Sequence, residues 1–139
     1  MLELVTYMCA MNAKNKKGNK IYCDALCGVV IDWDGEIHTG RESVRDTENE
    51  IDGLFVKGMV PVFVSCKNGD VDEDELYKLD CVANKFGIKY AKKILVVTDL
   101  QKNYNATLRF RNRARKMGIM VVDSVHKMTP AQISKRLSV

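Results

Sequence analysis

The sequence has no apolar run that approaches the roughly 18 residues needed for a membrane-spanning helix. Its start, MLELVTYMCAMNAKNKK, also lacks the basic segment followed by an apolar stretch that marks a secretory signal peptide. We therefore expect no membrane partner and a cytoplasmic location for this chain.

The sequence is also poor in the patterns that hold disulfides or zinc. Its five cysteines are odd in number, and no two of them have CxxC spacing; they are Cys9, Cys23, Cys27, Cys66 and Cys81. His38 and His126 have no partner at metal-ligand spacing. A disulfide framework and a structural zinc site are therefore both disfavoured. The cysteines fit a reducing compartment, where they act as small buried hydrophobic residues.

No internal repeat, low-complexity segment or linker interrupts the 139 residues, so we expect one domain over residues 1–139. The net charge is +4, but charge is unevenly distributed. Eight acids and two bases lie between Asp32 and Asp52, whereas nine bases and one acid lie between Lys89 and Lys116. The acidic block suits cations and the basic block suits phosphates, as in an enzyme acting on phosphodiesters. The alternative is that both blocks are solvated faces.

Hydrophobic periodicity and turn residues predict an α/β domain. The predicted elements are a helix ending near Ala13, strands at 27–35, 51–57 and 60–66, a helix between Asp72 and Gly87, a strand at 93–98, a helix at about 105–117, a strand at 119–122 and a helix opened by Thr129–Pro130. Residues 36–48 read as a polar loop, and Gly58–Met59 as a short hairpin connection. The order predicts a mixed sheet with a three-strand antiparallel meander, flanked by helices.

Four polar residues are expected to converge at one end of the hairpin formed by residues 51–57 and 60–66. Ser65 and Lys67 share a face of their strand because residues two apart point the same way. Asp52 begins the antiparallel partner strand, and Glu50 precedes it by two residues. Carboxylates of this kind bind Mg²⁺, which acidifies a bound water, and a nearby lysine can offset charge on a phosphate. The alternative is that Asp52 and Lys67 are ordinary surface groups at a hairpin end.

The order of elements and the D-x12-S-x-K pattern resemble the restriction-endonuclease-like PD-(D/E)-x-K nuclease fold. A closer resemblance is carried by five segments: GVVIDWDG (28–35), TENEID (47–52), VPVFVSCKNG (60–69), ELYKLDCVANKFG (75–87) and the YAKK-plus-strand segment (90–97). These are similar to the C-terminal nuclease domain of the CARF-domain ancillary nucleases of type III CRISPR systems. The resemblance covers most of the chain, from about Leu2 to Asp123.

The resemblance implies metal-dependent cleavage of DNA, RNA or both, with Mg²⁺ or Mn²⁺, in CRISPR-linked antiviral defence. By position, Glu3 matches the glutamate of the first helix, Asp52 the metal-binding aspartate and Lys67 the motif lysine. The equivalent of the Cys66 backbone carbonyl also reaches the metal in this fold. In better-known relatives a sensor domain binds cyclic oligoadenylate, and the proteins are homodimers. That sensor domain is expected to be absent here.

The sequence departs from the family pattern at Ser65, where the relatives have an acid two residues before the lysine. A hydroxyl is a poor Mg²⁺ ligand beside a carboxylate. Either Glu50 or Glu3 supplies the missing charge, leaving Ser65 as an outer hydrogen-bonding group, or the metal site is weak.

The basic segment near residue 110 supports a nucleic-acid partner. Arg109, Arg113 and Lys116 lie near one face of the predicted helix, and Arg111 and Arg115 lie on an adjoining face. Phosphate contacts by such residues give sequence-independent affinity that falls with salt. The alternative is a solvated helix that balances the acidic half of the chain.

Two other functions compete with the nuclease hypothesis. Ser65 favours a nucleic-acid-binding module whose catalytic site has decayed. The third hypothesis is a protein-interaction domain whose basic helix meets an acidic partner.

Overall fold

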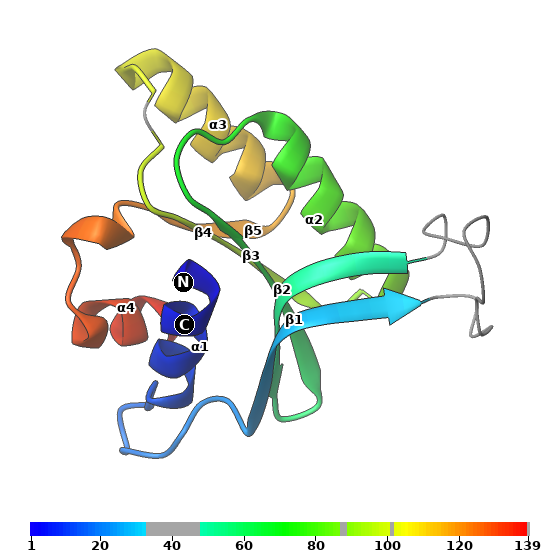
Figure 1. Cartoon of the computed structure of the whole chain (residues 1–139), viewed down its shortest axis with the longest axis vertical. Helices are drawn as coiled ribbons and strands as arrows, with labels where there is room; N and C mark the ends of the chain where they lie inside the picture. The colour runs from blue at the N-terminus through cyan, green and yellow to red at the C-terminus, as the bar shows by residue number, and fades with distance from the viewer. Residues whose placement is uncertain (33–47, 87–88, 101, 139) are drawn as a thin grey trace.

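The computed structural model describes residues 1–32, 48–86, 89–100 and 102–138, which form a five-stranded mixed sheet with helices on both faces (Figure 1). The elements are α1 (Leu2–Met11), β1 (Asp24–Asp32), β2 (Glu48–Lys57), β3 (Val60–Lys67), α2 (Glu73–Phe86), β4 (Lys92–Val97), α3 (Tyr104–Lys116), β5 (Ile119–Val122), a 3-10 turn (Val125–Lys127) and α4 (Pro130–Leu137). The predicted α/β class and mixed sheet are therefore confirmed.

The strands lie in the order in which they occur along the chain, from β1 to β5. β1, β2 and β3 form the expected antiparallel meander, and β3, β4 and β5 are parallel. The two parallel connections run through α2 and α3, which cover one face of the sheet, while α1 and α4 cover the other (Figure 1). This arrangement places the ends of β2 and β3 between the two helical layers.

Side chains of alternating strand residues build one hydrophobic core on each face of the sheet. On β3, Val62, Val64 and Cys66 are buried with residues of α1 and α4. Phe63, between them in sequence, is buried with residues of α2 and α3. β4 divides its side chains between the two cores in the same way. Its continuous apolar run is thus explained, because both of its faces are covered.

β1 and β2 are curved strands (Figure 1), and each contains one glycine. Gly28 has a φ of 63°, a left-handed conformation that glycine adopts without steric cost. At Gly53, a Cβ atom would lie 3.2 Å from side-chain atoms of both Phe55 and Val64, so a larger residue would crowd β3. The pairing of β2 with β3 then stops at Gly53 and Val64. Beyond that pair the two strands part, and their polar residues face the opening.

The structure corrects several predicted boundaries. β2 begins at Glu48 rather than Ile51, and β3 extends to Lys67 rather than Cys66. The 3-10 turn at Val125–Lys127 was not predicted from the sequence. The end of the predicted strand at 27–35, His38 and almost all of the predicted loop lie outside the described residues. No helix in the described part of the chain is long and apolar enough to cross a membrane.

One buried hydrogen bond joins the segment between α1 and β1 to the last residue of α4, and it yields a stability prediction. The Tyr22 hydroxyl donates to the Leu137 carbonyl at 2.7 Å, and burial raises the pKa of Tyr22 to about 12. Tyr22→Phe leaves that buried carbonyl without its donor and should lower the free energy of unfolding by about 1–2 kcal/mol in urea titrations followed by circular dichroism. Tyr104→Phe, at an exposed position, is the control and should change it by less than about 0.5 kcal/mol. Equal effects of both substitutions would contradict this role of the Tyr22 hydroxyl.

Candidate active site

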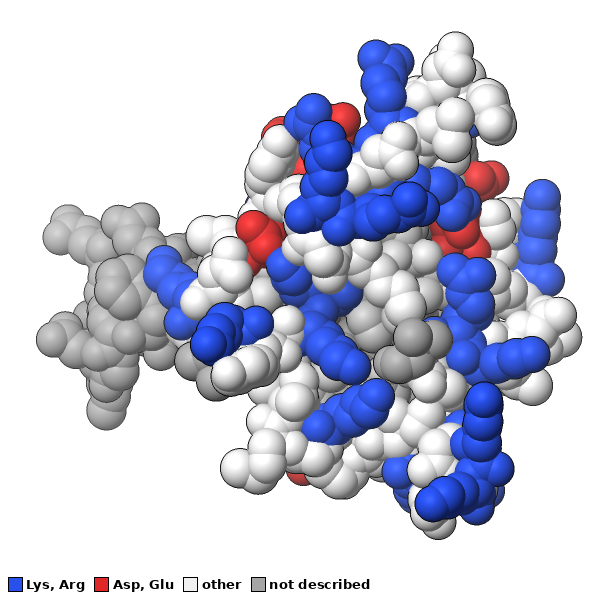
Figure 2. Space-filling view, turned by 180° about the vertical axis from the view of Figure 1, so that it is seen from behind, with Lys and Arg blue, Asp and Glu red and all other residues white. Residues whose placement is uncertain are grey.

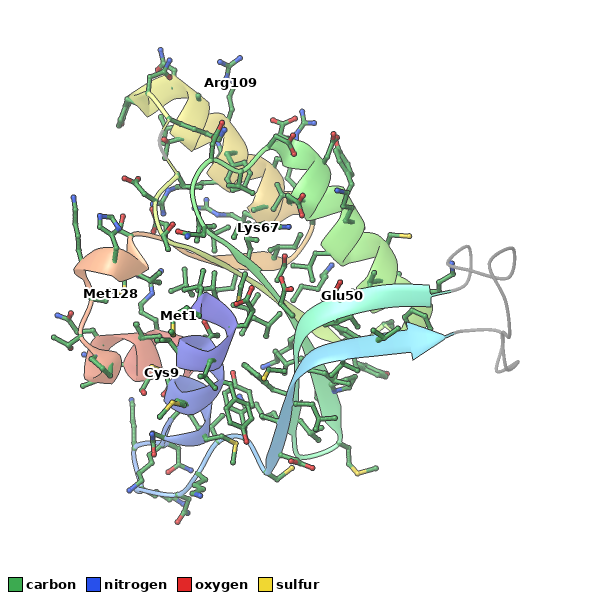
Figure 3. The ribbon with its side chains drawn as sticks, in the orientation of Figure 1. Met1, Cys9, Glu50, Lys67, Arg109 and Met128 are labelled. Atoms are coloured by element: carbon green, nitrogen blue, oxygen red, sulfur yellow. The ribbon has the colours of Figure 1, made fainter. Side chains whose placement is uncertain are left out.

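A small pocket of about 230 Å³ lies where β2 and β3 part, and the hairpin residues predicted to converge all line it. Asp52 and Glu50 come from β2, and Ser65 and Lys67 come from β3. Figure 3 labels Glu50 on β2 and Lys67 on β3. Ser65 and Asp52 are half-buried, whereas Glu50 is exposed. The predicted convergence of these four residues is thus present in the structure, while their chemical roles remain predictions.

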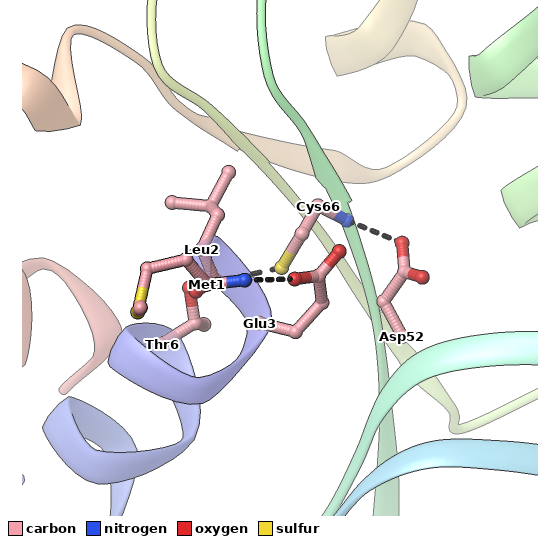
Figure 4. A network of polar contacts seen from close by, with 6 residues as sticks. All are labelled: Met1, Leu2, Glu3, Thr6, Asp52 and Cys66. Atoms are coloured by element: carbon pink, nitrogen blue, oxygen red, sulfur yellow. Dashed lines mark hydrogen bonds and ion pairs between the residues drawn. The ribbon is translucent and has the colours of Figure 1, made fainter.

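Asp52 is held in place by the backbone of the neighbouring strand. Its Oδ2 accepts a hydrogen bond from the Cys66 amide at 2.7 Å (Figure 4). That amide has no backbone partner on β2, because the ladder of hydrogen bonds has already ended at Gly53 and Val64. The bond satisfies a backbone donor and orients the carboxylate. None of the described residues donates a hydrogen bond to the other oxygen, Oδ1.

The thiol and the backbone carbonyl of Cys66 face different environments. Its thiol lies 3.7 Å from Thr6 Oγ1 on the side of α1, and burial raises the pKa of this thiol to about 12. The Lys67 carbonyl accepts from the Thr98 amide on the side of β4. Backbone groups of successive strand residues point in opposite directions, so the Cys66 carbonyl faces the opening beside Asp52. The thiol is therefore a core group, and only the carbonyl is available to the candidate site.

Glu3 approaches the same opening from α1, on the opposite face of the sheet from α2. Its carboxylate lies beside Cys66 and forms an ion pair of 3.3 Å with the Met1 amino group (Figure 4). Hydrogen bonds from its own backbone amide and from the Met1 amino group lower the pKa of Glu3, and the positive charge of Lys67 lowers it further. Glu3 is therefore ionised at neutral pH and close enough to Lys67 to feel its charge.

Glu75 is a further member of the pocket and was not among the predicted site residues. Its Oε2 lies 3.3 Å from Lys67 Nζ, and its Oε1 lies 3.3 Å from Lys78 Nζ. Only 18% of its side chain is exposed. The first turn of α2 follows β3 after a short connection, which brings Glu75 back over the end of that strand. In the sequence, Glu75 looks like an ordinary acid at a helix N-terminus, where the helix dipole favours it.

The donor atoms at the opening fit Mg²⁺ or Mn²⁺ in their chemistry. They are carboxylate oxygens of Asp52, Glu50 and Glu3 and the backbone carbonyl of Cys66, all of them hard ligands. Within the described ranges, no three His, Cys, Asp or Glu side chains are grouped closely enough to hold a metal ion by themselves. Mg²⁺ does not need such a cage, because it commonly binds through one or two carboxylates, several waters and a substrate phosphate. The arrangement thus fits a cation whose coordination a substrate completes.

The five predicted nucleic-acid-binding residues of α3 occupy two faces, as expected. Arg109, Arg113 and Lys116 line a groove between α2 and α3, and Arg111 and Arg115 line a hollow against β5. Two of the five pair with other residues that the structure describes: Arg111 pairs with Asp123, and Arg113 pairs with Glu73 at 2.8 Å and donates to the Tyr77 hydroxyl. Figure 2 shows Lys and Arg side chains spread widely over the face behind the view of Figure 1.

No protein-family model matches the sequence, and no curated protein matches it. Ten chains of solved structures resemble the fold. Protein VC1899 from Vibrio cholerae aligns over 99% of this chain and 32% of its own, with a TM-score of 0.70 and 18% identity. Can2 from Sulfobacillus thermosulfidooxidans, solved in complex with cyclic tetra-adenylate, aligns over 97% of this chain and 33% of its own, with a TM-score of 0.64 and 18% identity. The chain spans about a third of the length of both proteins and shares the fold of those parts.

The raised pKa of the Cys66 thiol predicts slow alkylation. At pH 8, a thiol with a pKa near 12 has about one thiolate in ten thousand molecules. Iodoacetamide should therefore label Cys66 at least 100-fold more slowly than the exposed Cys23, Cys27 and Cys81, as measured by peptide mass spectrometry. Buried Cys9, whose pKa burial also raises, should share the protection. Labelling of Cys66 as fast as that of Cys23 would show that its thiol does not face the core.

Proposed function

We propose that this chain is a nuclease domain that hydrolyses phosphodiester bonds of DNA, RNA or both with the help of Mg²⁺ or Mn²⁺. The observation that carries the proposal is the meeting of Asp52, the Cys66 carbonyl and Lys67 at the parting of two strands. An oriented carboxylate, a backbone carbonyl and an ammonium group form a donor set suited to a cation and a phosphate together.

The fold is consistent with this proposal and suggests a biological setting. Can2, which shares the fold over a third of its length, was solved with cyclic tetra-adenylate bound. The sequence resemblance implies the nuclease part of CRISPR ancillary proteins. We infer that the domain acts as an effector in CRISPR-linked antiviral defence. Fold alone does not determine function, so the proposal rests on the site.

Each residue of the pocket has a distinct role in the proposed reaction. Asp52 and the Cys66 carbonyl would hold the cation, with Glu50 and Glu3 as supporting carboxylates. When bound, the cation would acidify a coordinated water and offset developing charge on the phosphate. Lys67 would hold the attacking water or a phosphate oxygen by donating a hydrogen bond, and the Ser65 hydroxyl would serve as an outer hydrogen-bonding group.

Glu75 fixes Lys67 before substrate arrives. The ion pair between them keeps the ammonium group over the pocket, where one carboxylate oxygen serves Lys67 and the other serves Lys78. A phosphate entering the pocket would share Lys67 with Glu75. We therefore assign Glu75 as a positioning residue for Lys67.

The basic groove offers a route for the nucleic-acid backbone to the pocket. Glu73 and Glu75, both in the first turn of α2, line the groove and the pocket respectively. The two hollows therefore lie on either side of the same helical turn. Arg109 and Lys116 are exposed and form no ion pair with another described residue, so they are available to phosphates.

The second candidate function is a nucleic-acid-binding module without catalysis. It is favoured by Ser65, which provides a hydroxyl where the resemblance leads us to expect a carboxylate. This alternative requires binding that is unaffected by chelators and yields no cleavage product with any metal.

Substitutions in the pocket test the proposed chemistry. Purified protein with Mn²⁺ or Mg²⁺ should cleave single- or double-stranded DNA or RNA, and EDTA should stop the reaction. Asp52→Ala and Lys67→Ala should each reduce the cleavage rate by about 100-fold or more, because each removes a group that stabilises developing charge. Lys127→Ala, outside the pocket, serves as the control. Cleavage that persists in both pocket variants would overturn the assignment.

Substitutions on α3 test the proposed binding route separately from cleavage. In EDTA, the double variant Arg109→Ala, Lys116→Ala should weaken oligonucleotide binding and reduce the slope of log affinity against log salt by about 1–2. Fluorescence anisotropy across a salt series measures this slope. Arg111→Ala is the control on the same helix, because this guanidinium already pairs with Asp123. An unchanged slope in the double variant would show that this face of α3 is merely solvated.

A further inference from the structure

α1 is more apolar than a helix at the protein surface needs to be. Its sequence, LELVTYMCAM, has one charged residue, Glu3, and apolar residues around most of its circumference. The inner side buries Cys9 and Ala10, while Leu4 and Met8 on the other side are 48% and 56% exposed. A helix that is hydrophobic on all sides is usually buried on all sides. This one has a partner on only part of its surface.

A long groove runs between α1 and α4 beside the exposed side of α1. Its volume is about 990 Å³, and most of its surface is apolar. One wall is formed by Val5, Met8 and Cys9 of α1, which follow one another at helical spacing. The other wall is α4, which contributes the small side chains of Ala131 and Ser134. Small residues on one wall let the backbone of a third helix come close, as in helix-in-groove recognition.

The rim of this groove is basic, and no acid is found among the described residues that line it. Lys14, Lys16 and Lys135 line it, and none of them forms an ion pair with any residue in the described ranges. The two loop lysines are held by an ordered turn rather than a loose segment. In that turn, the backbones of Lys14 and Lys20 pair in an isolated antiparallel β-bridge. The Asn15 side chain accepts hydrogen bonds from the backbone amides of Lys17 and Asn19. The groove therefore presents positive charge beside an apolar floor, and two of its three lysines lie on an ordered backbone.

We propose that the α1–α4 groove binds an acidic amphipathic helix of a partner protein. The apolar floor suits a stripe of leucine-like side chains, and the lysine rim suits Asp or Glu beside that stripe. A nucleic-acid backbone would satisfy the lysines but would gain nothing from Val5 and Met8. The proposal is independent of the nuclease chemistry, because no residue that lines the groove also lines the pocket at Asp52 or the basic groove between α2 and α3.

Three synthetic peptides of roughly 18 residues test the occupant. The first carries leucines at i, i+3, i+4 and i+7 with flanking glutamates; the second has lysines in place of the glutamates; the third has the composition of the first with its stripe scrambled. The protein carries ¹³C-labelled methionine methyl groups, observed by NMR. We expect the acidic peptide alone to shift the Met8 signal. Met59, which is 96% exposed on the β2–β3 turn, is the internal control and should not move.

Variants of the exposed rim and wall then establish where the peptide binds. The triple variant Lys14→Glu, Lys16→Glu, Lys135→Glu should weaken binding of the acidic peptide by 10-fold or more, and Lys127→Glu should not. Ala131→Trp, at an exposed position on α4, should block the groove and abolish binding while its circular dichroism spectrum stays unchanged.

Four results would overturn the proposal. The first two are that the scrambled peptide, or the lysine peptide, binds as tightly as the acidic one. The third is that an oligonucleotide, instead of the acidic peptide, shifts the Met8 signal. The fourth is a concentration-dependent dimer that is lost in Ala131→Trp, which would identify the occupant as a second copy. Cleavage assays on the same variants separate this proposal from the nuclease proposal, because the groove variants should keep any activity that Asp52→Ala loses.

Discussion

The hydrogen bond between the Cys66 amide and Asp52 is the interaction on which the candidate site depends. The β2–β3 ladder ends at Gly53 and Val64, so the next amide of β3 that faces β2 would lack a partner. A carboxylate supplies the missing acceptor, and an ionised acceptor makes a stronger bond than a neutral one. The fold requires an acceptor for the Cys66 amide, and meeting this requirement orients Asp52, the group proposed to bind a cation. The same parting of strands leaves the Cys66 carbonyl facing Asp52.

The site also depends on the position of the β3 end between two helical layers. Alternation along β3 sends the Cys66 thiol into the core beneath α1 and sends Lys67 to the pocket beneath α2. Each layer then contributes an acid, Glu3 from α1 and Glu75 from α2. β2 and β3 approach each other closely at Gly53 and Val64, and their pairing ends there, next to the point where these groups meet. The geometry is therefore a property of the whole sheet rather than of a local motif.

The sequence was sufficient for features that depend on short-range periodicity and insufficient for those that depend on how distant elements pack. The hairpin, its connection at Gly58, and the convergence of Asp52 with Lys67 follow from a period of two and an antiparallel turn. The position of Glu75 over Lys67 depends on the angle at which α2 returns across the sheet, which no local pattern specifies. The pairing of Arg113 with Glu73 depends on the same packing of α2 against α3. Similarly, the sequence showed an apolar first helix, but only the placement of α4 revealed a groove beside it.

The central claim is that Asp52, fixed by a backbone amide, binds a divalent cation at the parting of β2 and β3. A crystal of this protein soaked with Mn²⁺ and a non-cleavable phosphorothioate oligonucleotide tests it most directly, through anomalous scattering from the metal. We predict an anomalous peak within coordination distance of Asp52 and the Cys66 carbonyl, next to a phosphate and on the same side as Lys67. A loaded crystal with oligonucleotide in place but no peak beside Asp52, or with a peak elsewhere on the protein, would contradict the account.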